Sequence, residues 1–253
     1  MGLPQSKEAN NDPIKSIVVL IAMEAEAKPF IDELKLEPVA LNGSASLGIA
    51  YQGQLNDIKV TVVTNGKSSK FGVDNVGTIP ATLAAYIAIT TIQPDLVINA
   101  GTAGGFKRKT ANIGDVFIGT KFKNHDRRIP IPGFDKYGVG DYDGVSCKKL
   151  AKDLGFKSGT VTTSNSLDHN DDDDKIMLEN DASVKDMEAA AIAWVAEETK
   201  TPFFALKVVT DIVDGDRPTQ EEFLENLGAA AKSLQLALPK LINYIKGKSL
   251  SQL

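Results

Sequence analysis

The sequence predicts an α/β fold, in which helices cover both faces of a mixed or parallel sheet. Short apolar runs recur along the 253-residue chain, and segments with helical spacing lie between several of them. Unbroken apolar runs are typical of strands buried on both faces, and strands that alternate with helices indicate βαβ crossovers. No internal repeat and no linker rich in Pro, Gly or Ser divides residues 1–253, which we therefore interpret as one domain.

The first strand and the first helix follow a polar N-terminal segment. Residues from about 1 to 14 lack the basic start and apolar core of an export signal, and we expect them to form a flexible tail. Ile17–Ala22 is an unbroken apolar run and predicts the first strand. Met23–Leu34 predicts a helix, which tolerates Pro29 because this residue lies near the first turn.

Apolar or alternating runs predict the other strands at Gly48–Gln52, Ile58–Thr64, Leu96–Ala100, Asp115–Gly119, Gly159–Thr163 and Phe203–Val209. A helix is predicted over Asn75–Thr91, where apolar residues recur at helical spacing (Val76, Ile79, Leu83, Tyr86 and Ile87), and another over the alanine-rich Glu188–Thr199.

The last predicted helix has a clear start. Thr219 and Glu222 form a capping-box pattern directly after Pro218. One apolar face then follows, made of Phe223, Leu227, Ala231, Leu234 and Leu238. We expect Pro239 to kink or interrupt the helix before Leu241–Lys246.

The acidic run that precedes this region has two interpretations. Asp171–Asp174 could belong to a calcium loop, but the spacing lacks the central Gly and the terminal Glu of an EF-hand. Neighbouring like charges stay hydrated, which favours a solvated loop that leads into a short helix.

The composition excludes several classes of function. With 28 Lys and Arg against 33 Asp and Glu, the net charge is −5, which argues against a nucleic-acid binder that acts by gross basicity. Two histidines and the single Cys147 are too few for a His/Cys zinc site, and one cysteine allows no intrachain disulfide, as in a reducing compartment. No apolar run approaches the roughly 20 residues of a membrane span, so we expect a cytoplasmic protein without membrane contact.

A glycine-rich segment follows one of the predicted strands directly. Asn99–Phe106 contains Gly101, Gly104 and Gly105, but it matches neither the G-x-G-x-x-G pattern of dinucleotide-binding proteins nor a P-loop. It is either a tight structural turn or a place where a ligand approaches the backbone.

Three carboxylates lie at strand or helix ends that can converge on one cleft: Glu26, Glu188 and Asp211. Such a group could activate a water, protonate a leaving group or hold sugar hydroxyls. Glu26 and Glu188 could equally be acids that the helix dipole favours at helix N-termini.

Several motifs in one order resemble the nucleosidases that cleave 5′-methylthioadenosine, and their plant-type members most closely. The matching segments are Ile21–Ala27, Asn99–Phe106, Ala111–Val116, His125–Pro130, Lys185–Glu188 and Val209–Gly215. The resemblance extends from about Ile17 to Leu253. It implies a three-layer α/β/α nucleoside-phosphorylase-like fold with a central mixed sheet, usually in a homodimer, and an enzyme that needs no metal or organic cofactor.

The resemblance also implies roles for individual residues. Glu26 matches the residue that activates the attacking water, and Asp211 matches the acid that protonates adenine N7. Glu188 matches the carboxylate that binds ribose hydroxyls. The other substrate-binding residues implied by the resemblance are Thr102, Leu167, Asp168, Lys185, Asp186, Met187, Phe223 and, across a dimer interface, Phe134.

The resemblance leads us to expect hydrolysis of 5′-methylthioadenosine to adenine and 5-methylthioribose in methionine salvage, with S-adenosylhomocysteine as a possible second substrate. A glutamate at position 26 would repel phosphate, so water is the expected nucleophile rather than the phosphate of a phosphorylase. An inactive storage or nucleoside-binding relative is the other alternative. Lys207 lies near the end of a predicted strand and is either a sugar contact or a structural cation.

One segment departs from the family pattern. The family has Gly-Asp where this chain has Ser164 and Asn165, so Asn165 cannot supply the carboxylate expected near the catalytic acid.

Overall fold

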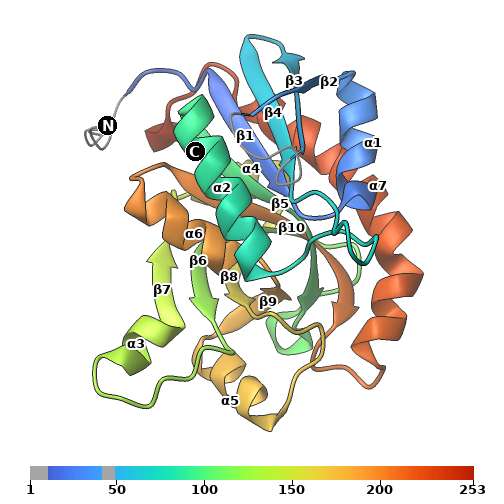
Figure 1. The fold of residues 1–253 in the computed structure, drawn as a ribbon, viewed down its shortest axis with the longest axis vertical. Helices are drawn as coiled ribbons and strands as arrows, with labels where there is room; N and C mark the ends of the chain where they lie inside the picture. Colours follow the sequence, from blue (N-terminus) through green and yellow to red (C-terminus); the bar gives the residue numbers. More distant parts are fainter. Residues whose placement is uncertain (1–10, 42–48) are drawn as a thin grey trace.

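A computed structural model of the chain describes residues 11–41 and 49–253 (Figure 1). The predicted flexible tail therefore lies for the most part outside the described residues. Ile14, at the approximate end of this predicted tail, is buried, and its N–H donates to the Lys248 carbonyl at 2.9 Å. This contact joins the start of the described chain to the segment after the last long helix.

In the described part of the chain, the centre of the molecule is a mixed sheet of ten strands, in the order β10-β6-β8-β9-β5-β1-β4-β3-β2, with β7 beside β6. β10 pairs with β5 as well as with β6, so five strands (β10, β6, β8, β9 and β5) form a closed ring. The strands are β1 (Ser16–Ile21), β2 (Glu37–Val39), β3 (Ile49–Leu55), β4 (Ile58–Thr64), β5 (Leu96–Gly105), β6 (Val116–Asn124), β7 (Gly140–Asp143), β8 (Lys157–Thr163), β9 (Ala182–Asp186) and β10 (Phe203–Ile212).

Helices cover both faces of this sheet, as Figure 1 shows, and confirm the predicted three-layer α/β/α arrangement. Residues of α1 (Glu24–Leu34), α4 (Lys148–Leu154) and α7 (Thr219–Ile245) share one apolar core with the sheet, and residues of α2 (Thr78–Ile92) and α6 (Ala189–Glu198) share the other. The remaining elements are α3 (Phe134–Val139), α5 (Asp171–Glu179) and the 3₁₀ turns Lys107–Lys109 and Leu250–Gln252. None of the described helices is both long and apolar enough to cross a membrane.

The glycine-rich segment is part of a strand and not a turn. β5 runs from Leu96 to Gly105 and pairs with β10 as far as Gly105, so it extends well beyond the predicted end at Ala100. Several strands are likewise longer than predicted, and the short strands β2, β7 and β9 have no counterpart among the predictions. The glycines of β5 lie in this strand because neighbouring side chains occupy the space that a Cβ would need.

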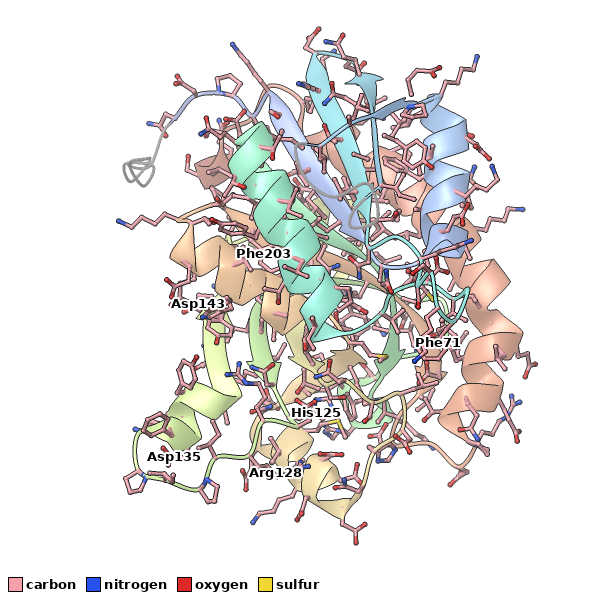
Figure 2. All side chains as sticks on the ribbon, in the orientation of Figure 1. Phe71, His125, Arg128, Asp135, Asp143 and Phe203 are labelled. Atoms are coloured by element: carbon pink, nitrogen blue, oxygen red, sulfur yellow. The ribbon has the colours of Figure 1, made fainter. Side chains whose placement is uncertain are left out.

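Three large apolar residues of α2, Ile79, Leu83 and Tyr86, face outward, although Ile89 is buried. The helix begins at Thr78, three residues after the predicted start, and buries its alanine face (Ala81, Ala84, Ala85 and Ala88). Ile79 is 73% exposed and Tyr86 is 56% exposed. Phe71, in the loop before the helix and labelled in Figure 2, is 71% exposed. The apolar spacing therefore identified the helix, but the small residues are the ones that pack against α6 and the sheet.

The start and the continuity of α7 both differ from the prediction. Glu222 makes no capping bond, and its carboxylate instead accepts the Ile212 N–H of β10 at 2.9 Å. The helix also continues through Pro239 to Ile245. Proline costs one helical hydrogen bond, but α7 buries Leu234, Leu238, Leu241 and Ile242 against the sheet, and this burial holds the helix together.

The acidic run leads into a helix, as predicted, but the four aspartates form the first turn of α5 rather than the loop before it. Asn170 caps this helix by accepting the Asp173 N–H at 3.0 Å. Carboxylates are stabilised at a helix N-terminus, and buried Asp173 also pairs with the Arg128 guanidinium.

Candidate active site

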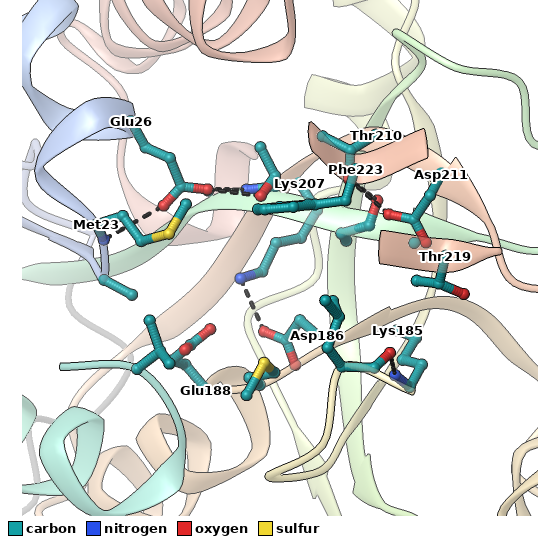
Figure 3. Close-up of a pocket in the computed structure, with 18 of the residues that line it drawn as sticks. Met23, Glu26, Lys185, Asp186, Glu188, Lys207, Thr210, Asp211, Thr219 and Phe223 are labelled. Atoms are coloured by element: carbon teal, nitrogen blue, oxygen red, sulfur yellow. Dashed lines mark hydrogen bonds and ion pairs between the residues drawn. The ribbon is translucent and has the colours of Figure 1, made fainter. Parts of the chain in front are cut away.

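The main cavity has a volume of about 250 Å³ and lies where the carboxyl ends of β5, β9 and β10 meet the start of α1 (Figure 3). β5 and β9 pair at Gly104 and Lys185, and β5 and β10 pair at Gly104 and Asp211. The cavity brings together most of the predicted site residues: Glu26, Thr102, Leu167, Lys185, Asp186, Met187, Glu188, Asp211 and Phe223.

Glu26 lies in the first turn of α1 and points across β5. Its Oε1 accepts two hydrogen bonds from Thr102, one from the backbone N–H and one from the hydroxyl, both at 2.7 Å. Gly101 permits this approach, because a Cβ there would lie only 3.3 Å from the same oxygen. The carboxylate is 3% exposed and is therefore fixed in one position in the cavity wall.

A buried ion pair lines the cavity beside Glu26. Lys207 Nζ lies 2.8 Å from Asp186 Oδ2, and the two side chains are 1% and 0% exposed. Asp186 also accepts the Thr163 hydroxyl at 2.6 Å and the Ala189 N–H at 2.9 Å, which satisfies it from two further elements. Burial disfavours the charged lysine, but Asp186 and Glu188 outweigh burial and raise the pKa of Lys207. Lys207 is thus a structural cation of the cavity wall that faces carboxylates.

Glu188 is the N-cap residue of α6, and its Oε1 accepts the Gly77 N–H at 2.9 Å. Burial raises the pKa of Glu188 to about 7, and the neighbouring Asp186 carboxylate adds to this effect. Figure 3 shows Glu26 and Glu188 on one side of the cavity and Asp211 on the other. A ligand in the cavity therefore meets two carboxylates at one end and a separate acid at the other.

Asp211 stands at the end of β10, where its Oδ1 accepts the Thr210 hydroxyl at 2.7 Å. Burial raises the pKa of Asp211, while the Thr210 hydroxyl and Lys185 act in the opposite direction. A carboxyl with a raised pKa holds its proton to higher pH and is suited to donate it.

Lys185 fixes the adjacent loop. Its Nζ donates to the carbonyls of Ser166 at 3.0 Å and Leu167 at 2.6 Å, and burial lowers its pKa. The Leu167 side chain is thereby held over the cavity, with Phe223 of α7 also on its lining. These apolar groups, together with Met187 and Val76, form apolar walls beside the charged side chains, and this combination is typical of small-molecule sites.

Two predicted residues do not line this cavity. Asp168 is exposed, and Phe134 is 56% exposed on α3. Asn165, which departs from the family pattern, is also exposed outside the cavity. Its Oδ1 accepts the Thr78 N–H at 3.0 Å and so caps α2, while its Nδ2 donates to Asp126 at 3.2 Å.

Some lining residues were not predicted as site residues. Met23, Val76 and Thr219 lie on the cavity wall, and Lys207 was left open between two roles. A lysine within the otherwise apolar Phe203–Val209 was the available signal for a buried ion pair. Met23 and Val76 carry no such signal, because apolar residues are usual in any buried position. Within residues 11–41 and 49–253, no group of three or more His, Cys, Asp or Glu side chains could hold a metal ion.

Comparisons with known proteins agree with this geometry. The model of the phosphorylase superfamily matches residues 16–243. A 5′-methylthioadenosine nucleosidase of Arabidopsis thaliana is 46% identical over 95% of this chain and 91% of its own. A 5′-methylthioadenosine/S-adenosylhomocysteine nucleosidase of the same plant is 48% identical over 95% and 96%.

The fold comparison gives the same relationship. The apo structure of an Arabidopsis thaliana 5′-methylthioadenosine nucleosidase superimposes with a TM-score of 0.93 at 46% identity and covers 95% of this chain and 100% of the relative. The chain therefore belongs to the phosphorylase superfamily and, within it, to the 5′-methylthioadenosine nucleosidases.

Proposed function

We propose that this protein hydrolyses the N-glycosidic bond of 5′-methylthioadenosine and releases adenine and 5-methylthioribose. The observation that carries the proposal is the convergence of Glu26, Glu188 and Asp211 on one cavity, with Asp211 on the side opposite the other two. The relatives at 46% and 48% identity, which bear the name of this nucleosidase activity, support it.

Each of the three carboxylates has a separate role in the proposed reaction. Asp211, with its raised pKa, donates a proton to N7 of adenine as the glycosidic bond breaks. Glu26 accepts a proton from the attacking water, so that the proton lost by Asp211 is balanced by the one gained at Glu26. Glu188 binds the ribose hydroxyls, and the two carboxylates near the sugar stabilise its oxocarbenium-like transition state. General acid–base help of this kind contributes about 10²–10⁴-fold.

Water is the proposed nucleophile because the cavity does not suit a phosphate. Glu26 and Glu188 line the sugar end, and Lys207, a cation that interacts with both, is neutralised by Asp186. A phosphate ion would therefore face uncompensated negative charge. If adenine release requires added phosphate and yields a sugar 1-phosphate, the protein is a phosphorylase instead.

An assay of adenine release from 5′-methylthioadenosine tests the proposal directly. Wild-type protein is expected to release adenine, and Glu26→Gln and Asp211→Asn are expected to reduce kcat by at least about 10²-fold. The control is the exposed Glu221→Gln, which removes one carboxylate outside the cavity. A wild-type protein that binds the nucleoside without releasing adenine would support the storage or nucleoside-binding alternative.

S-adenosylhomocysteine is proposed as a second, poorer substrate. Its amino-acid tail carries charge, whereas the walls offered by Met23, Val76, Leu167 and Phe223 are apolar. Support for some activity comes from the relative that is named for both substrates. Comparison of kcat/KM on the two nucleosides tests this, and equal values would contradict the expected preference.

The same proposal extends to assembly and cellular context. We propose a homodimer formed through the exposed apolar face of α2, where Ile79, Leu83 and Tyr86 are 40–73% exposed, with Phe134 at the partner's site. Sedimentation velocity should show a dimer for the wild type and a monomer for Ile79→Glu, and a monomeric wild type would contradict the proposed dimer.

Methionine salvage in the cytoplasm is the proposed setting, which the free thiol of buried Cys147 supports.

A further inference from the structure

A β-bulge immediately precedes Asp211. β10 pairs with β5 up to Val209 opposite Ala103 and resumes at Asp211 opposite Gly104, so Thr210 has no partner in the ladder. A bulge bends its strand and redirects the side chains that follow. Here it turns Asp211 toward Gly104, whose missing Cβ leaves room for the carboxylate, because a Cβ would lie 2.6 Å from Oδ2. The position of this acid therefore depends on what stabilises the bulge.

Two residues of α7 bind the backbone on either side of Asp211. Asn226 Nδ2 donates to the Thr210 carbonyl at 3.0 Å, and Glu222 Oε2 accepts the Ile212 N–H at 2.9 Å. The two residues are four apart and lie on the same face of the helix. The first turns of α7 thus supply hydrogen-bond partners for one residue before and one residue after the acid.

Glu222 also brings a negative charge to this point. Its side chain is only 10% exposed, so solvent screens the charge weakly. Burial raises the pKa of Asp211, and Glu222 raises it further, against Lys185 of β9 and the Thr210 hydroxyl.

Other charged groups in the loop after β10 and on α7 form ion pairs of their own. In the loop after β10, Arg217 Nη1 lies 3.8 Å from Glu222 Oε1, and its Nη2 donates to exposed Glu225 at 2.7 Å. Asp214 pairs with Arg108. β5 contributes only Gly104 at the point of contact. Among the described residues whose charge acts on Asp211, Glu222 is the one that favours the protonated acid.

We propose that Glu222 is a positioning residue for Asp211. Glu222 holds the bulge through the Ile212 N–H and brings a poorly screened negative charge to the same strand end. This inference rests on the proposed function, in which Asp211 protonates the leaving base. It assigns Glu222 a role through Asp211 and not a contact with substrate, since Glu222 does not line the cavity.

The test is the pH dependence of kcat/KM for adenine release by the full-length protein. Because Asp211 acts as an acid, activity falls on the basic side as Asp211 loses its proton. Glu222→Gln retains an oxygen that can accept the Ile212 N–H but removes the charge, so the basic limb is expected to move down by about one pH unit. Glu221→Gln, an equal change of charge on the exposed side of the same turn, is expected to leave the limb unmoved.

Two further variants separate charge from hydrogen bonding. Asn226→Ala removes the bond to Thr210 and is expected to lower kcat without moving the basic limb. Arg217→Gln removes the cation beside Glu222 from an exposed position and is expected to move the limb upward, opposite to Glu222→Gln. Arg217→Gln also tests the charge if Glu222→Gln folds poorly. If wild type is active and both charge variants superimpose on its profile, the inference is overturned.

A readout without turnover distinguishes this failure from failure of the proposed function. If wild-type protein releases no adenine at any pH, the proposed function is wrong, and carboxyl ¹³C NMR titration of Asp211 then decides the inference alone. A lower Asp211 pKa in Glu222→Gln than in wild type supports the inference, and equal values overturn it.

Discussion

Replacement of Gly104 by alanine should damage catalysis far more than stability. The added Cβ would lie 2.6 Å from Asp211 Oδ2 and 2.6 Å from a methyl group of Val213. Both neighbours must withdraw by about 0.8 Å to reach ordinary contact at 3.4 Å. Asp211 is the easier one to displace, because its carboxylate is the free end of a side chain and points into the cavity.

The magnitude follows from this displacement. Overpacking in a buried strand typically costs about 1–3 kcal/mol in the free energy of unfolding. A misplacement of about 1 Å in a catalytic group can cost on the order of 10²-fold in rate. We therefore expect Gly104→Ala to remain folded and to lose about 10²-fold in kcat for adenine release. KM should change little, because the substrate-binding residues on the opposite side of the cavity are unaffected.

Gly105→Ala is the matched control. Its Cβ would lie 2.7 Å from Ala111 and 2.8 Å from Val209, so it overpacks the same strand without touching Asp211. Urea unfolding should give similar losses of stability for the two variants, while kcat should fall much further in Gly104→Ala. Gly228→Ala, in the exposed part of α7 with no atom within 4 Å of the added Cβ, should be neutral or stabilising by up to about 1 kcal/mol. Equal kcat values for Gly104→Ala and Gly105→Ala would refute the reasoning.

Three other predictions address groups outside the reacting pair. Lys207→Met leaves buried Asp186 without its cation and should cost about 3–5 kcal/mol in urea unfolding, whereas a loss below about 1 kcal/mol would contradict a buried ion pair. His125 lies beside Arg128 (Figure 2), and burial lowers its pKa from 6.5 to about 4. The folded protein holds His125 neutral, so its contribution to stability is fully present above pH 6.5 and is lost as the pH falls toward 4. Between pH 7 and 4, the free energy of unfolding of wild type should therefore fall by about 3 kcal/mol more than that of His125→Gln. Parallel stability curves would show that His125 is not the cause. Asn165→Asp should change kcat by less than about threefold, because residue 165 is outside the cavity, but it should lower stability at low salt through repulsion from Asp126. A large loss of turnover would show that Asn165 matters for catalysis.

Much of the fold could be predicted from local pattern. The buried strands around Ile17–Ala22 and Phe203–Val209 were found because both of their faces are covered, which makes the apolar run continuous. The short strands β2, β7 and β9 were missed, because three to five residues carry too little periodicity to separate a strand from a loop. The position of Glu188 as an N-cap was close to the prediction, since helix ends depend on local contacts.

Other features could not be predicted locally, because competing partners are distant in the sequence. Thr219 and Glu222 match a capping box, yet the Glu222 carboxylate accepts a hydrogen bond from the Ile212 N–H of β10, ten residues away, and not from the helix N-terminus. The apolar spacing of α2 gave the correct helix, but packing against α6 selected the alanine face for burial. An N-cap bond is worth about 1 kcal/mol, and for Glu222 the tertiary contact with β10 prevailed over this local preference.

The sequence by itself determined the α/β class, the order of the main elements and, through a resemblance spread over six motifs, the family. It also supplied Glu26, Glu188 and Asp211 as candidates, although the local context of Glu26 and Glu188 was also consistent with ordinary helix-terminal acids. Only the tertiary structure decided that the three line one cavity, that Lys207 is neutralised by Asp186, and that a bulge held by Glu222 directs Asp211. The physical reason is that proton affinity and charge balance depend on burial and on neighbours brought from β5, β9, β10, α1 and α7, which are far apart along the chain.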